Sequence, residues 1–222
     1  MVEIATSILN IKKEEAIKTL YNLEEAKTDY FHIDVMDGKF VTNNTNELML
    51  NYCEYLNSIT NLPLDVHLMV EDVKTYIDSY LVFEPNRITI HWEALNNKDE
   101  ALKWLKYIKE NNCRVGISIK PKTNVEEIYE LLPYIHQVLI MTVEPGKGGQ
   151  AFMPEMIQKI EQLKEHLEKN KLEVDIEVDG GINLENIEAV KKAGANIIVA
   201  GTSIINSNDP KDTIKKMKQN ND

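Results

Sequence analysis

The sequence predicts a single (β/α)8 barrel domain over residues 1–222, and three observations lead to this fold. Short apolar or alternating segments take turns with longer amphipathic segments, and eight such pairs occur along the chain. A chain of 222 residues accommodates one lean barrel and can bury a full core without disulfide or metal cross-links. No linker or break in composition marks a domain boundary. Eight strand–helix units in one unbroken stretch favour a closed barrel.

The eight predicted strands are short, and each carries a continuous apolar run or an apolar–polar alternation. They are expected at Glu3–Ser7, Tyr30–Met36, Leu64–Met69, Arg87–His91, Arg114–Ile119, Gln137–Met141, Val174–Asp179 and Asn196–Ala200. Amphipathic helical segments follow them at 12–26, 46–60, 72–81, 98–111, 124–132, 154–169, 183–193 and 209–219. Asn124 and Asn183 suit helix N-caps, Pro154 suits a first helical turn, and Gly194 suits a helix end.

The element order also allows a second fold, a doubly wound open sheet. The alternation of apolar and polar residues within the strands favours the barrel. Central strands of an open sheet are apolar on both faces. In the segment 30–36, however, Ile33 faces one side while His32 and Asp34 face the other, and three further strands alternate in the same way. Since the apolar faces must meet the helices, we expect the polar faces to point into the barrel.

Charge and composition limit the classes of function. Lys and Arg number 25 and Asp and Glu number 36, which gives a formal net charge of −11. An acidic protein is not expected to bind nucleic acid as its main task, although a local pocket can still hold a small anion. The two cysteines, Cys53 and Cys113, are interpreted as buried thiols. With no secretory leader and no membrane-spanning apolar run in the sequence, we expect a cytoplasmic protein without membrane partners.

Polar residues at the carboxyl ends of the strands indicate a cation site. His32 and Asp34 share one face of their strand, His67 occupies the equivalent place on the next strand, and Asp179 ends the seventh. Burying these groups without compensation costs several kcal/mol each, and a bound cation would offset that cost. The ligand types suit Zn²⁺, Fe²⁺, Mn²⁺ or Co²⁺, whereas a buried polar network without an ion is the alternative. The expected inward acidic set also includes Asp65, Asp175 and Glu177.

Glycine-rich segments follow three adjacent strands, at 144–150, 179–181 and 200–203, and the last of them opens a short helical turn. Barrel enzymes often hold a phosphate with backbone N–H groups at this position, and glycine lets the backbone approach an anion closely. Each loop alone is compatible with a plain turn, but three neighbouring loops favour a phosphate site.

Six segments resemble the ribulose-5-phosphate 3-epimerase family. They are SIL (7–9), HIDVMDGKFVTN (32–43), LDVHLMV (64–70), IHWEA (90–94), MTVEPGKGGQAF (141–152) and VDGGI (178–182). The resemblance runs from Ser7 to about Ile205, in family order. It implies a (β/α)8 barrel, one divalent metal ion (zinc, iron or manganese, with cobalt allowed), and interconversion of D-ribulose 5-phosphate and D-xylulose 5-phosphate. It also implies a homo-oligomer that takes a small phosphorylated sugar.

The resemblance also implies roles for residues that match the family motifs. The metal ligands would be His32, Asp34, His67 and Asp179, with Asp34 and Asp179 as the two acid–base groups on opposite faces of an enediolate. The substrate-binding residues would be Ser7, Met36, His67, Met69, Met141, Gly146, Gly148, Gly149, Gln150, Gly180, Gly181, Gly201 and Thr202.

The sequence departs from the family pattern at a few positions. Asn10 and Ile11 replace a small residue and Asp, and Thr42 replaces Pro. Lys147 and Lys120 replace Phe and Asn, and both lysines could add positive charge near a phosphate, although a solvated Lys147 in its loop is the alternative. These changes bear on the substrate more than on the reaction type.

Three other functions remain open. The first is D-allulose-6-phosphate 3-epimerase of the same superfamily, although the intact pairs Gly148-Gly149 and Gly180-Gly181 favour the pentose. The second is a phosphosugar-binding barrel without catalysis, which the complete set of histidines and aspartates disfavours. The third is a metal-free lyase or decarboxylase, which would leave His32 and His67 unexplained.

Overall fold

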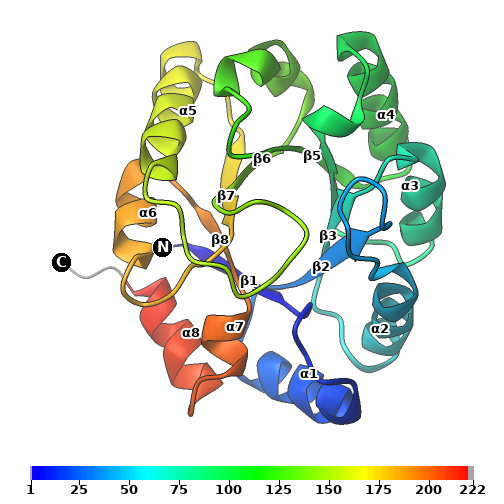
Figure 1. The fold of residues 1–222 in the computed structure, drawn as a ribbon, viewed down its shortest axis with the longest axis vertical. Coiled ribbons are helices and arrows are strands. Elements are labelled where there is room, and N and C mark those ends of the chain that lie inside the picture. The colour runs from blue at the N-terminus through cyan, green and yellow to red at the C-terminus, as the bar shows by residue number, and fades with distance from the viewer. Residues whose placement is uncertain (1, 220–222) are drawn as a thin grey trace.

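The computed structural model describes residues 2–219, and these form a closed barrel of eight parallel strands in sequence order (Figure 1). The strands are β1 Glu3–Ser7, β2 Tyr30–Met36, β3 Leu64–Met69, β4 Arg87–His91, β5 Arg114–Ile119, β6 Gln137–Met141, β7 Asp175–Asp179 and β8 Ile197–Ala200. β1 pairs with both β2 and β8, which closes the sheet. The barrel prediction is therefore confirmed, while residues 1 and 220–222 of the expected domain lie outside the described residues.

Helices surround the barrel and cover its outer face (Figure 1). The α-helices are α1 Ala16–Glu25, α2 Asn46–Ile59, α3 Val73–Leu81, α4 Lys98–Glu110, α5 Met156–Asn170, α6 Ile187–Ala193, α7 Thr202–Ile205 and α8 Pro210–Lys218. The 3-10 segments are η1 Lys13–Glu15, η2 Trp92–Ala94 and η3 Val125–Tyr134. The expected short turn after the eighth strand is α7.

The segment expected as a helix at 124–132 is the 3-10 helix η3. Its start is as predicted, because the Glu127 side chain accepts a hydrogen bond from the Asn124 backbone N–H at 3.1 Å. Pro133 lies inside this segment. Proline removes a backbone donor and crowds the carbonyl four residues earlier, so it disfavours a regular α-helix here.

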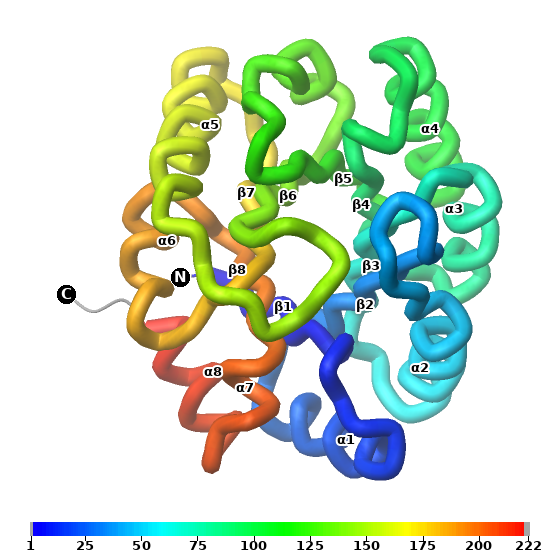
Figure 2. The backbone as a smooth tube through the Cα atoms, viewed as in Figure 1, coloured from blue at the N-terminus to red at the C-terminus, as the bar shows by residue number. Residues whose placement is uncertain are grey.

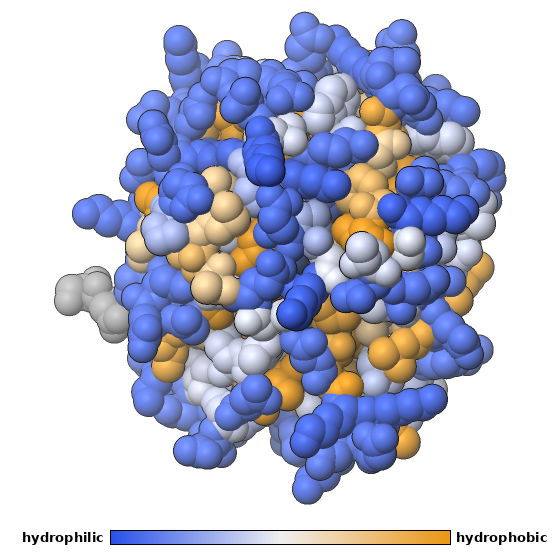
Figure 3. Space-filling view, in the orientation of Figure 1, coloured by the Kyte–Doolittle hydropathy of each residue, from blue (hydrophilic) through white to orange (hydrophobic). Residues whose placement is uncertain are grey.

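The barrel wall separates an apolar shell from a polar interior. Phe31, Ile33 and Val35 are fully buried in the shell between strands and helices. Buried polar residues instead line the interior: His32, Asp34, Asp65, His67, Arg87, Thr89, His91, Ser118, Gln137 and Glu177. The alternation within the strands thus correctly predicts which of these side chains face the helices and which face the barrel interior. On the face seen in Figure 3, hydrophilic side chains cover most of the outer helices.

One layer of the interior is a hydrogen-bonded network, which we call the Arg87 layer and which consists of Asp65, Arg87, Gln137 and Glu177. Arg87 donates to the side chain of Gln137, which donates in turn to Glu177. Arg87 Nε also lies 3.7 Å from an Asp65 oxygen. The acidic groups of this layer therefore have a positive charge of the protein itself beside them.

Asp175 does not belong to this interior, contrary to expectation. It is the first residue of β7, is only partly buried, and pairs with Arg114 at 2.9 Å. At the end of a strand the alternating pattern no longer decides burial, because one side chain can reach solvent beyond the barrel rim.

In Figure 2 the loop after β6 extends across the face of the barrel, and the loop after β2 stands at the edge of that face near α2 and α3. They are tied together where Asn43 donates a hydrogen bond to the Gly146 carbonyl at 2.6 Å. Among residues 2–219, no helix is long and apolar enough to cross a membrane.

Candidate active site

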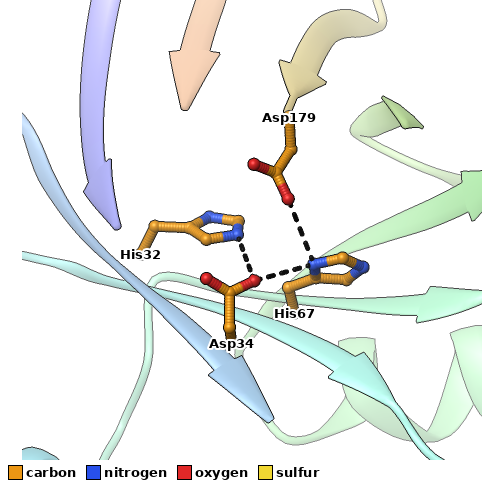
Figure 4. Close-up of side chains that lie close together, drawn as sticks. All are labelled: His32, Asp34, His67 and Asp179. Carbon is orange, nitrogen blue, oxygen red and sulfur yellow. Dashed lines mark hydrogen bonds and ion pairs between the residues drawn. The ribbon is translucent and has the colours of Figure 1, made fainter. Parts of the chain in front are cut away.

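His32, Asp34, His67 and Asp179 meet inside the barrel near the carboxyl ends of their strands (Figure 4). His32 and Asp34 come from β2, His67 from β3 and Asp179 from β7, and one ligand atom of each lies within 4.8 Å of the others. Asp34 and His67 are register partners on neighbouring strands, whereas Asp179 reaches the group from the other side of the barrel. The sequence prediction that these four residues converge is confirmed.

The four side chains fit a divalent cation. An Asp34 oxygen lies 3.3 Å from His32 Nε2 and 3.3 Å from His67 Nδ1, and an Asp179 oxygen lies 3.9 Å from His67 Nδ1. His32 Nε2 is buried and makes no hydrogen bond. A buried polar atom without a partner is costly, and a cation ligated by two imidazole nitrogens and two carboxylates would satisfy it.

The two aspartates have opposite pKa shifts. Burial raises the pKa of Asp34, but the neighbouring His32 and His67 outweigh it and lower the pKa below its usual range. Burial, together with the negative charge of Asp34, raises the pKa of Asp179 to about 6. A pair of carboxylates with such different proton affinities can hold one proton, on Asp179, up to about pH 6.

Hydroxyl groups hold Asp34 in place. Ser7, at the end of β1, donates a hydrogen bond to an Asp34 carboxylate oxygen at 2.7 Å. Thr45 donates to the Asp34 backbone carbonyl at 2.6 Å and accepts from the Met36 backbone N–H at 3.0 Å. The Asp34 carboxylate is therefore fixed both through its backbone and through its side chain.

Asp65 lies behind His32, on the side away from the four-residue cluster. An Asp65 oxygen is 2.7 Å from His32 Nδ1. Burial raises the pKa of Asp65, but its pairing with His32 and the nearby Arg87 lower it to about 2. His32, Asp65 and Glu177 form a second group of possible metal ligands. Because Arg87 already supplies positive charge there, the first group is the better candidate for a cation.

A cavity of about 460 Å³ opens above the cluster. Met36, Met69 and Met141 line it near the strand ends, and His32 and His67 are fully buried beneath it. The other predicted residues that line it are Ser7, Asp34, Gly146, Gly148, Gly149, Gln150, Asp179, Gly180, Gly181, Gly201 and Thr202. The structure thus brings together the residues that the sequence predicts at the substrate site.

The glycine-rich loops after β6, β7 and β8 gather on one side of this cavity. Asn10, from the loop after β1, donates a hydrogen bond to the Thr202 hydroxyl at 3.0 Å. A Cβ atom on Gly148 would lie 2.3 Å from the Asn10 side chain. Asn10, which departs from the family pattern, therefore lies between two loops of the predicted phosphate site.

Gly181→Ala should destabilise the protein more than Gly149→Ala. Both glycines have positive φ, +70° and +73°, and such strain costs alanine roughly 1–2 kcal/mol. At position 181 a Cβ would also lie 2.3 Å from the Phe152 backbone nitrogen, while at position 149 the nearest atom is 3.9 Å away. Urea unfolding of the two variants measures the difference. Equal losses of unfolding free energy would contradict the close approach of the two loops.

The two lysines that depart from the family pattern lie in different places. Lys147 lines the cavity and is exposed to solvent. The Lys120 ammonium lies 3.8 Å from the centre of the Phe40 ring, beside β5 and away from the glycine-rich loops, so its expected place near the phosphate is wrong. Lys120 directly follows the end of β5 at Ile119, and the Phe40 ring beneath its ammonium lies 4.9 Å from the ring centre of the buried His91.

Sequence reasoning missed His91 and Glu93 as neighbours of the cluster. His91 Nε2 lies 2.9 Å from His67 Nε2, and a Glu93 oxygen lies 3.0 Å from His91 Nδ1. Burial lowers the pKa of His91 to about 4. The available signal was the inward phase of His91 at the end of the fourth strand.

Comparisons with known proteins identify the family of this chain. The model of the Ribulose-phosphate 3 epimerase family matches residues 3–205. A ribulose-phosphate 3-epimerase of Eremothecium gossypii is 40% identical over 204 residues, which cover 88% of this chain and 82% of that protein. The one from Methanocaldococcus jannaschii is 35% identical over 219 residues, which cover 99% of this chain and 91% of that protein.

Among solved structures, 3-hexulose-6-phosphate synthase from Salmonella typhimurium shares the fold at 12% identity. Its TM-score is 0.70, and the match covers 97% of this chain and 96% of that one. This likeness supports the barrel alone. The family match and the identities above 30% reach further: the chain belongs to the Ribulose-phosphate 3 epimerase family and is an epimerase of the isomerase class.

Proposed function

We propose that the protein interconverts D-ribulose 5-phosphate and D-xylulose 5-phosphate by moving a proton at C3 through an enediolate. The observation that carries the proposal is the placement of two aspartates, Asp34 on β2 and Asp179 on β7, on different sides of one cavity floor. Inversion at a carbon next to a carbonyl needs one acid–base group on each face of the planar intermediate.

His32, Asp34, His67 and Asp179 would hold one divalent cation of zinc, iron, manganese or cobalt. When bound, it would act as a Lewis acid for the negative charge that develops on the substrate oxygens. The cluster supports this assignment through its two carboxylates and through the buried, unpaired His32 Nε2.

The aspartates would divide the proton transfer between them. Asp34, whose pKa is lowered, would accept the C3 proton as a carboxylate, and Ser7 would keep its second oxygen in place. Asp179, whose pKa is raised to about 6, would deliver a proton to the opposite face. In the reverse direction the two roles exchange, because each step leaves the other carboxyl group protonated.

The remaining residues would bind the substrate and keep water away. Met36, Met69 and Met141 offer soft apolar contacts and no proton that competes with the aspartates. The backbones of Gly148, Gly149, Gly181, Gly201 and Thr202 would hold the phosphate. We also propose, from the family resemblance, that the protein acts in the cytoplasm in the pentose phosphate pathway as an assembly of identical chains.

Turnover on two sugar phosphates tests the proposed substrate. We expect kcat/KM for D-ribulose 5-phosphate to exceed that for D-allulose 6-phosphate by at least about tenfold, since one extra carbon and hydroxyl must fit the same cavity. A preference for the hexose phosphate would reassign the enzyme to the allulose branch. Deuterium uptake from solvent at C3 provides the second measurement. Binding of the sugar phosphate without exchange would contradict catalysis altogether.

A further inference from the structure

His67 is held from behind by a second histidine. His91, on β4, places Nε2 at 2.9 Å from His67 Nε2, and the two ring centres are 5.0 Å apart. Both side chains are fully buried. His67 Nδ1, on the other side of its ring, points toward Asp34 and Asp179 in the cluster (Figure 4). His67 therefore stands between the proposed cation site and His91.

Glu93 sets the direction of the hydrogen bonds. One carboxylate oxygen accepts from the Lys120 backbone N–H at 2.6 Å and from the Thr123 hydroxyl. The other lies 3.0 Å from His91 Nδ1. A carboxylate only accepts hydrogen bonds, so neutral His91 must carry its hydrogen on Nδ1 and present a lone pair at Nε2.

The tautomer of His91 determines the tautomer of His67 in the same way. Since His91 Nε2 accepts, His67 must donate through Nε2–H, which leaves the lone pair of His67 on Nδ1. This is the nitrogen that faces the cluster. The chain of contacts from Glu93 through His91 thus selects the form of His67 that can ligate a cation.

We propose that His91 and Glu93 are positioning residues that fix His67 in its Nε2–H tautomer and so present Nδ1 to the cation. This inference rests on the proposed function in so far as it concerns a bound metal, whereas the tautomer itself is a property of the protein alone. Partners that fix the free nitrogen of a metal-binding histidine typically change metal affinity about 10- to 100-fold.

His32 provides an internal comparison. Its Nδ1 lies 2.7 Å from an Asp65 oxygen, so its hydrogen is held there and Nε2 is left for the cluster. The two histidines therefore present different nitrogens, and each has an acceptor on the far side of its ring. One is held directly by a carboxylate and the other through an intervening imidazole.

Glu93→Gln is the sharpest test because it reverses the donors without removing the side chain. The Lys120 backbone N–H can only donate, so the amide oxygen must stay beside it and the NH₂ group must face His91. His91 would then carry its hydrogen on Nε2 and donate to His67, which moves the His67 hydrogen to Nδ1. We expect Zn²⁺ to bind the metal-free variant about 10- to 100-fold more weakly than the wild type.

His91→Leu and His91→Gln separate positioning from packing. Leucine leaves His67 Nε2–H without an acceptor and should weaken Zn²⁺ binding about as much as Glu93→Gln. Glutamine can place its carbonyl oxygen near the position of Nε2 and should restore most of the affinity. His166→Leu is the matched control, because this half-buried histidine of α5 stacks on Tyr129 outside the barrel interior, and the variant should bind Zn²⁺ like the wild type.

Two measurements complete the test. Calorimetric titration of the metal-free proteins with Zn²⁺ gives the affinities, with circular dichroism as the check on folding. Nitrogen-15 NMR of the imidazoles reads the tautomers directly, and we expect Nε2–H for His67 and Nδ1–H for His91 in the metal-free wild type. An Nδ1–H form of His67, or wild-type Zn²⁺ affinity in folded Glu93→Gln, would overturn the inference. Failure of the wild type itself to bind any divalent metal would instead count against the proposed function.

Discussion

Asp179→Asn should lower the rate of C3 epimerisation by about 100-fold or more, and Asp34→Asn should do the same. An amide keeps the size of each side chain but neither takes up nor delivers a proton at C3. Both residues line the cavity floor, and their pKa values are shifted in opposite directions, as a pair that shares acid and base roles requires. Steady-state assay of the two variants in both reaction directions gives the loss.

Asp175→Asn is the matched control, because Asp175 lies on the same strand as Asp179 but at its opposite end, paired with Arg114. We expect this variant to keep wild-type kcat. Nuclear magnetic resonance in deuterated water adds a finer readout, since loss of one base should block exchange on one face of C3. If either Asp34→Asn or Asp179→Asn retained nearly full activity, the two-base assignment would be wrong.

Removal of divalent metal should abolish epimerisation, and addition of Zn²⁺, Mn²⁺ or Co²⁺ should restore it. The reason is electrostatic: negative charge develops on the substrate in a buried site that already holds two aspartates. The experiment combines exhaustive chelation, metal analysis of the treated protein, and assay before and after metal addition.

A sample carried through the same dialysis without chelator is the control for inactivation by handling. A His32→Gln variant should bind the metal more weakly, since His32 contributes Nε2 to the cluster. Full turnover by protein that analysis shows to be free of metal would exclude a catalytic cation and would leave the four side chains as a polar network.

The sequence predicted the strand positions closely because the period-two alternation is repeated in many strands. The strand expected at 174–179 is β7 Asp175–Asp179, and the one expected at 196–200 is β8 Ile197–Ala200. The same alternation identified His32 and Asp34 as inward residues, and the closed topology then placed Asp179 opposite them. These predictions follow from local geometry and from strand order alone.

Contacts that depend on side-chain orientation or on the exact end of an element could not be predicted from the sequence. The donor chain from Glu93 through His91 to His67 depends on ring orientations that no spacing encodes. The exposure of Asp175 and the position of Lys120 over Phe40 depend on where a strand ends, to within one residue. The 3-10 form of η3 depends on Pro133, whose effect on a helix end competes with a good capping signal at Asn124.

The Arg87 layer has a consequence for how the barrel assembles. Asp65 and Arg87 belong to β3 and β4, while their partners Gln137 and Glu177 belong to β6 and β7. A half-barrel that ended after β4 would keep the Arg87 guanidinium without the acceptor that it finds across the barrel, and the other half would keep the Gln137 side-chain oxygen without its Arg87 donor. Partly formed barrels are thus penalised, so folding of the two halves is coupled and the chain should unfold in one cooperative transition.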